Sequence, residues 1–118
     1  MVSRVDLHLH TTVSDGALRP EELVRAASIA GIQVMAVTDH DSVDGIRDAE
    51  RAASDLPIQV IPGIEVSAGL DGDDVHVLGY FLDPGDRVLR EALSRLQEGR
   101  VAQVRSMVER LAELGWPL

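Results

Sequence analysis

The chain has 118 residues, 45% of them hydrophobic, which is enough for one small domain with a core. A net charge of −9 argues against a broad basic surface that would bind nucleic acid through its phosphates. Cysteine is absent, so disulfides and thiolate metal sites are excluded, and any metal must bind to histidine and carboxylate groups. The N-terminal residues do not resemble a secretion signal and no apolar run reaches membrane-spanning length, so we expect a cytoplasmic protein without a membrane partner.

Strand and helix patterns alternate along the first half of the chain. The expected strands are residues 5–10, 34–38 and 58–65, and the expected helices are residues 20–30 and 42–53. Pro20 and Gly31 fit the two ends of the first helix. Asp41 or Ser42 is a candidate N-cap of the second. Such alternation predicts an α/β fold with a parallel sheet.

The second half of the sequence predicts a hairpin followed by helix. Residues 71–74 contain Asp-Gly and indicate a turn, after which residues 75–81 form a strand that returns beside the preceding one. From Asp86 onward, two sets of apolar residues recur at helical spacing. Gly99 lies between the two sets, and we expect it to break the helix.

The chain contains four histidines, and each lies near an end of a predicted strand: His8, His10, His40 and His76. His8 and His10 are two residues apart on one strand, so their side chains leave the same face with Cα atoms about 7 Å apart. That spacing is within reach of a shared ion. An isolated His-x-His is equally compatible with two ordinary histidines on a half-buried strand, so other residues must decide.

Carboxylates near the same strand ends are the other candidate ligands. Asp15 precedes a glycine and, taken alone, fits a simple tight turn better than a metal site. Asp39 and Asp41 could orient or cap the following helix, and for Asp41 this interpretation is preferred. His40, between them, fits a core histidine as well as a ligand. Glu65 favours the ligand interpretation, because a carboxylate in an apolar strand is costly to bury without a cation or strong hydrogen bonds.

The topology brings these groups together. In a parallel barrel the functional end lies at the carboxyl ends of the strands, where His10, Asp15, His40 and Glu65 are all expected. A hairpin returns the start of its second strand to that end, so His76 joins them. The sequence therefore predicts one pocket that gathers histidines and carboxylates.

Five ordered motifs give the chain a resemblance to a known family: His8-x-His10, Ser14-Asp15-Gly16, Thr38-Asp39-His40-Asp41, Pro62-Gly63-Ile64-Glu65 and His76-Val77-Leu78-Gly79-Tyr80-Phe81. They resemble the N-terminal motifs of the PHP (polymerase and histidinol phosphatase) family of metal-dependent phosphoesterases. The resemblance implies the N-terminal portion of a distorted (βα)7 barrel. Residues 1–85 would be part of the PHP catalytic domain, and residues 86–118 would start a helical insertion.

The resemblance also implies a metal site with six ligands: His8, His10, Asp15, His40, Glu65 and His76. It would bind two or three divalent ions, either Mn, Zn or Fe. By the same resemblance, His8, His10 and Glu65 hold one ion, and Glu65 bridges to a second ion shared with His76. A third ion would lie between Asp15 and His40. Asp39 would take part in catalysis by orienting a ligand without touching an ion.

The implied function is hydrolysis of a phosphate ester by metal-activated water. The partner would be a phosphorylated small molecule or a nucleic-acid end, and the apparent insertion favours nucleotides and RNA ends. Substrate-binding residues and a general acid are not identifiable. Family members are more than twice as long and supply later ligands, so the chain resembles a truncated piece whose activity alone is open. The alternatives are a non-catalytic metal-binding or interaction module and an amidohydrolase-like enzyme that hydrolyses C–N bonds.

Overall fold

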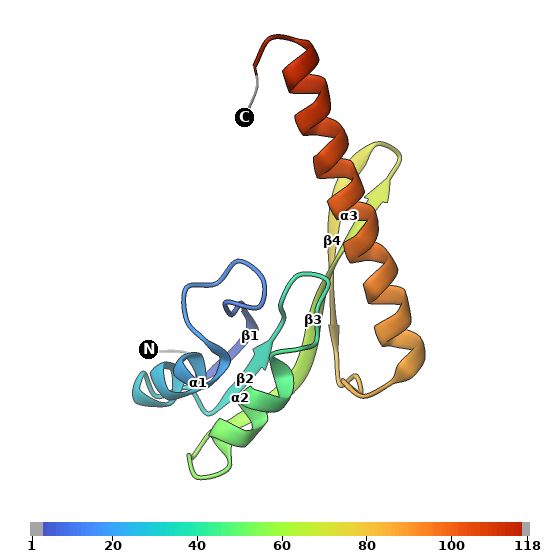
Figure 1. Ribbon diagram of the computed structural model, residues 1–118. Coiled ribbons are helices and arrows are strands. Elements are labelled where there is room, and N and C mark those ends of the chain that lie inside the picture. The colour runs from blue at the N-terminus through green and yellow to red at the C-terminus, as the bar shows by residue number, and fades with distance from the viewer. Residues whose placement is uncertain (1–3, 117–118) are drawn as a thin grey trace. The chain divides into compact units, whose positions relative to one another are not determined.

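The computed structural model describes residues 4–116, and within them four strands form one mixed sheet in the order β1-β2-β3-β4 (Figure 1). The strands are β1 (Val5–Leu9), β2 (Val34–Val37), β3 (Gln59–Leu70) and β4 (Asp73–Tyr80), and the helices are α1 (Pro20–Ile29), α2 (Ile46–Ala53) and α3 (Arg87–Glu113). The first three strands are parallel, and β4 returns antiparallel to β3. The predicted α/β class is confirmed.

The sheet is strongly curled. β1 and β4 lie at opposite ends of the strand order, yet the Tyr80 hydroxyl donates a hydrogen bond of 2.9 Å to the Leu7 carbonyl. One side chain can span the two outer strands only if the sheet bends toward a barrel.

Helices α1 and α2 bury their apolar faces with the sheet. The core consists of Val24, Ala27, Met35, Val37, Ala49, Ala53 and Ile58. Side chains on β2 alternate between the two faces of the sheet. Met35 and Val37 lie on the face that packs into this core, and the side chain between them points to the other face.

The hairpin between β3 and β4 has a two-residue turn. Asp71 has φ 52° and Gly72 has φ 92°, and Leu70 pairs with Asp73 across them. Positive φ at both central positions is the property of the type I′ turn that Asp-Gly favours. The hairpin prediction is therefore confirmed, and its continuous register sets which residues of β3 face His76.

The predicted cap of the second helix was wrong. α2 begins at Ile46 with Gly45 as its N-cap, and neither Asp41 nor Ser42 caps it. Asp41 has φ 50°, and its buried carboxylate accepts the backbone N–H of Ser67 at 2.9 Å. Asp can adopt this left-handed conformation when its side chain has a local partner, and here that partner lies on β3.

The predicted helix break at Gly99 was also wrong, because α3 is continuous from Arg87 to Glu113. A glycine weakens a helix interior by about 1 kcal/mol relative to alanine, which the helix formers on both sides can outweigh. The helix ends after Glu113, where Gly115 has φ 86° and the N–H of Trp116 bonds to the Leu111 carbonyl. That is a glycine C-cap.

The chain divides into two compact units, one ending at Asp86 and one beginning at Arg87. The interpretation of the second unit as the start of an insertion stays a prediction. Across residues 4–116, none of the helices combines the length and the apolar character that crossing a bilayer requires.

We expect Gly99→Ala to stabilise α3 by about 1 kcal/mol, since an added Cβ meets nothing within 4 Å and alanine has the higher helix propensity. Thermal unfolding followed by circular dichroism measures this gain. The matched control, Ala102→Gly on the same helix, should lose a similar amount. A loss of stability in Gly99→Ala would contradict a continuous helix.

Candidate metal centre

All six predicted ligands meet at one end of the sheet. His8 lies in β1 and His10 directly after it, while Asp15 lies in the loop that follows. The remaining three come from other elements: His40 after β2, Glu65 in β3 and His76 in β4.

Glu65 is the centre of the cluster. Its side chain is 6% exposed, and its Oε2 lies 2.8 Å from His8 Nε2 and 3.0 Å from His10 Nε2. Its other oxygen, Oε1, lies 2.8 Å from His76 Nδ1. His40 Nε2 is 3.8 Å from Oε2. A single buried carboxylate therefore faces four imidazole rings, two from strands β1 and β4 and two from the segments that follow β1 and β2.

Asp15 lies on the solvent side of the same cluster. Its side chain is 67% exposed, its Oδ1 lies 3.1 Å from His10 Nδ1, and its Oδ2 lies 3.4 Å from His40 Nε2. His10 thus has Glu65 at one ring nitrogen and Asp15 at the other. Asp15 and Glu65 therefore approach the His10 ring from opposite sides, whereas both face the same nitrogen of His40, Nε2.

Backbone pairing beyond the end of β2 places His40 beside Glu65. The Glu65 N–H donates to the Asp39 carbonyl at 3.1 Å, and the Asp41 N–H donates to the Glu65 carbonyl at 2.9 Å. These two bonds form an isolated parallel bridge between His40 and Glu65. The loop after β2 is therefore fixed to β3 at the residue where the carboxylate lies.

The donor atoms form three overlapping groups, each with its ligand atoms within 4.8 Å of one another: His8, His10 and Glu65; His10, Asp15 and His40; and His40, Glu65 and His76. Two ligands that are each about 2.1 Å from one ion lie about 3.0–3.4 Å apart at octahedral or tetrahedral angles. Most of the contacts above fall close to that separation. Nitrogen and carboxylate donors of this kind suit Zn, Mn or Fe.

The electrostatics of the cluster also suit a cation. Burial acts to raise the pKa of Glu65, but hydrogen bonds from His8 and His76 and the charges of His40 and His8 hold this pKa below its usual value. Glu65 is therefore ionised at neutral pH. The ring centroids of neighbouring imidazoles are only 4.6–5.2 Å apart, so four protonated rings would repel one another.

One buried donor atom at the centre of the cluster lacks a hydrogen bond. His10 Nδ1 is shielded from solvent, and no described residue forms a hydrogen bond with it, although Asp15 lies at ion-pair distance. A buried polar atom without a hydrogen bond usually indicates a missing ion or water. The residues present thus fit a metal site.

Asp39 holds the loop that carries Asp15. Its buried carboxylate accepts three bonds of 2.7 Å: from the Thr11 N–H, the Thr11 hydroxyl and the Ser14 hydroxyl. Within residues 4–116, these partners of the Asp39 carboxylate do not include a histidine of the cluster. Its position indicates that it orients Asp15 through the loop.

Gly16 completes this loop for a steric reason. A Cβ at this position would lie 2.2 Å from the His10 carbonyl oxygen, and the Gly16 N–H donates to the Thr11 carbonyl at 2.8 Å. The tight turn considered for Asp15 and its approach to the histidines are thus features of the same loop.

Sequence reasoning missed the hydroxyl groups that support the cluster. Thr38 bridges to β1, since its Oγ1 accepts the Leu9 N–H at 3.2 Å and lies 3.1 Å from the Leu9 carbonyl. Thr11 and Ser14 bind Asp39. The only signal in the sequence was their position beside the candidate ligands.

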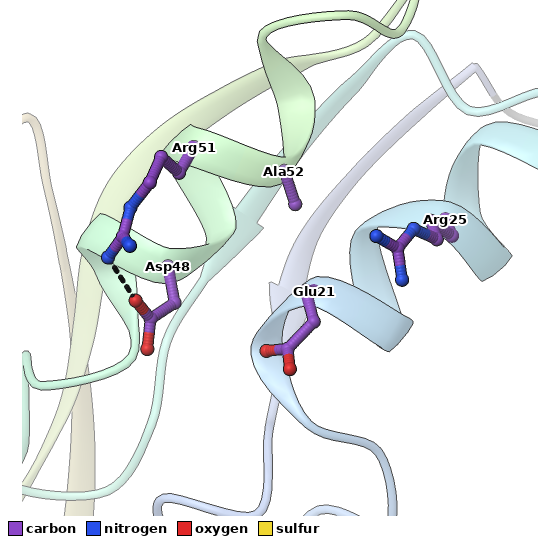
Figure 2. Close-up of a pocket in the computed structure, with 5 residues that line it drawn as sticks. All are labelled: Glu21, Arg25, Asp48, Arg51 and Ala52. Carbon is purple, nitrogen blue, oxygen red and sulfur yellow. Dashed lines mark hydrogen bonds and ion pairs between the residues drawn. The ribbon is translucent and has the colours of Figure 1, made fainter.

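A separate charged hollow lies on α1 and α2. Figure 2 shows its lining residues, Glu21, Arg25, Asp48, Arg51 and Ala52. Arg51 pairs with Asp48 within one helix, as the dashed line shows. None of the six cluster residues lines this hollow, and the mixture of charges within it gives no preference for an anion.

A curled α/β sheet that gathers histidines and carboxylates where its first two parallel strands end is typical of α/β-barrel proteins, whose functional sites lie at that end. A sequence profile of the PHP domain matches residues 6–97. The chain therefore belongs to the PHP domain family.

Relatives of assigned function agree with this membership. A 5'-3' exoribonuclease of Haemophilus influenzae is 37% identical over 113 residues, which is 93% of this chain and 41% of the relative. A 3',5'-nucleoside bisphosphate phosphatase of Chromobacterium violaceum is 35% identical, over 97% of this chain and 40% of the relative. The chain thus spans about two fifths of these proteins.

Solved structures show the same relationship. A Chromobacterium violaceum protein described as an amidohydrolase, with bound sulfate and no metal, superimposes with a TM-score of 0.88 at 34% identity, covering 98% of this chain and 41% of its own. A Bifidobacterium adolescentis protein described as a candidate metal-dependent phosphoesterase superimposes with a TM-score of 0.83 at 30% identity. The match covers 92% of this chain and 38% of that protein. The predicted fold, the N-terminal portion of a PHP barrel, is confirmed.

We expect Asp39→Ala to lower the free energy of unfolding by on the order of 3 kcal/mol, because it leaves three buried donors without their charged acceptor. Urea denaturation of the metal-free protein measures the loss. Asp55→Ala, at an exposed position, is the control and should change stability by less than about 0.5 kcal/mol. Equal effects of the two substitutions would contradict the role of Asp39 in holding the loop.

Proposed function

We propose that the protein is a metal-dependent phosphoesterase that acts on a nucleotide or a nucleic-acid end. The observation that carries this proposal is Glu65, a buried carboxylate whose two oxygens contact three imidazoles at 2.8–3.0 Å. Such a group is costly to bury unless a cation compensates it. Membership of the PHP domain family supports a phosphoesterase as the kind of enzyme in which that cation would act.

The proposed ligands divide between the two sides of Glu65. His8 and His10 face its Oε2 and would hold one ion with it. His76 faces Oε1 and would share a second ion with Glu65. The separation of the two oxygens between different histidines supports a bridging role for this carboxylate.

Asp15 and His40 are proposed to hold a third ion on the exposed side of the cluster. Their closest contact is 3.4 Å, from Asp15 Oδ2 to His40 Nε2. The exposure of Asp15 supports a position at which a substrate could approach. Asp39 would act on this part of the site only through the Thr11–Ser14 loop.

Bound divalent ions would supply a nucleophilic water at neutral pH and neutralise the phosphoryl oxygens. The six proposed ligands would hold the ions, and the hydrogen bonds of Asp39 would keep the loop that carries Asp15 in place. The −9 net charge and the absence of lysine mean that the protein itself gives little general attraction for a phosphate. Binding of a substrate anion would therefore depend on the metal centre and on individual arginines.

The relatives support the choice of substrate class. One is named for hydrolysis of nucleoside bisphosphates and another for exonuclease action on RNA from the 5' end. The similar Chromobacterium violaceum structure contains sulfate, a tetrahedral oxyanion like phosphate. These names describe longer proteins, and the corresponding activity of this chain is part of the proposal.

A C–N hydrolase is the second candidate, since the same Chromobacterium violaceum structure is described as an amidohydrolase. The two functions share the histidine cluster and differ in the bond that is attacked. Cleavage of an amide without release of phosphate from a nucleotide would favour this candidate.

The purified protein should contain Mn, Zn or Fe and should release phosphate from adenosine 3',5'-bisphosphate. We expect Glu65→Gln to remove bound metal and to lower phosphate release by more than about 100-fold, because even partners of metal ligands cost about 10–100-fold. Elemental analysis and a phosphate assay on the same sample measure both. Glu50→Gln, an exposed carboxylate on α2, is the matched control and should behave like wild type.

The pattern of failure is informative. Stoichiometric metal without hydrolysis would indicate a binding module in place of an enzyme. Full metal content in Glu65→Gln would remove Glu65 from the site and contradict the proposal.

A further inference from the structure

Ser67 lies on the same face of the β3–β4 hairpin as the metal cluster. It is two residues beyond Glu65 on β3, and it pairs directly with His76 on β4. Side chains two residues apart on a strand share a face, and so do side chains that are directly opposite on antiparallel strands. The contact between His76 and Glu65 shows that this face is the one bearing the ligands. Ser67 therefore extends the row of ligands by one position.

The hydroxyl of Ser67 is buried without a hydrogen bond. Its Oγ is shielded from solvent, and no residue among those described offers it a partner. The backbone of Ser67 is satisfied, since its N–H donates to Asp41 Oδ1 at 2.9 Å. Only the side chain is left unpaired, although serine can both donate and accept.

An unpaired buried hydroxyl is unfavourable in the protein alone. Buried polar groups in native structures nearly always have a partner, and exceptions require an explanation such as a bound ligand or water. Alanine at this position would fit the same space without the lost hydrogen bond. A ligand that is present only in the loaded site would give the hydroxyl a partner. Such a ligand accounts for serine at this position in place of alanine.

We propose that the Ser67 hydroxyl donates a hydrogen bond to an oxygen of the phosphate bound at the metal centre, on the side of the second ion between Glu65 and His76. This inference rests on the proposed phosphoesterase function and adds a substrate-binding residue to it. A hydroxyl that donates to an ionised phosphate oxygen forms a charge-assisted hydrogen bond, which is stronger than one between neutral groups.

The test compares Ser67→Ala, Ser67→Cys and Ser67→Thr in the Mn-loaded protein, with inorganic phosphate as the probe. Calorimetric titration measures phosphate affinity, and elemental analysis measures Mn content. We expect Ser67→Ala and Ser67→Cys to retain Mn and to bind phosphate roughly tenfold more weakly, as the loss of one hydrogen bond to a charged group predicts. Ser67→Thr keeps the hydroxyl on a strand that tolerates β-branching, and should remain within about threefold of wild type.

A control measurement separates binding from folding. Without metal and phosphate, Ser67→Ala should melt at the wild-type temperature or slightly above it, because it removes an unpaired buried hydroxyl. Ser67→Cys changes a single atom and serves if alanine disturbs the strand.

Three results would overturn the inference. Unchanged phosphate affinity in both Ser67→Ala and Ser67→Cys would do so while leaving the proposed function intact. Loss of Mn with unchanged phosphate affinity of the loaded fraction would place the hydroxyl on the metal side. Absence of Mn from the wild-type protein would instead overturn the proposed function together with the inference that rests on it.

Discussion

The burial of the Glu65 carboxylate is the constraint on which the rest of the site depends. An ionised group that is almost inaccessible to solvent must be compensated, and the groups placed to hold a compensating cation beside it are histidines up to 57 residues away in sequence. The fold meets this need by placing β3 between the end of β2 and strand β4. Moving any of these elements would leave the Glu65 carboxylate without a partner. The chemistry of the site therefore requires this order of strands in the sheet.

The supporting contacts act at the backbone as well as at the side chains. Asp39 and Asp41 bind both backbone polar groups of Glu65, and the Asp39 carboxylate holds the opposite loop. Asp41 then reaches on to the N–H of Ser67. A short run of residues after β2 therefore fixes β3 on one side and the Asp15 loop on the other.

The elements could be predicted from the sequence because they depend on local patterns, and the meeting of the candidate ligands could be predicted because a parallel sheet brings the ends of its strands together. The alternation of strands and helices, the Asp-Gly turn and the position of histidines at strand ends are short-range features, and each was recovered at about the correct residues. Asp41 was misassigned because its carboxylate pairs with Ser67, a partner that only the folded sheet brings near. The Gly99 error had a different cause: the propensity of a single residue was weighted above that of the long helix around it. The unpaired state of the Ser67 hydroxyl depends on packing and has no signal in the sequence.

The most direct test of the account is a crystal structure of the Mn-loaded protein with anomalous difference maps collected on both sides of the Mn absorption edge. Anomalous peaks are expected within bonding distance of Glu65, one shared with His8 and His10 and one shared with His76. Peaks elsewhere on the molecule, with Glu65 still bonded only to histidines, would contradict the view that this buried carboxylate is the centre of a metal site.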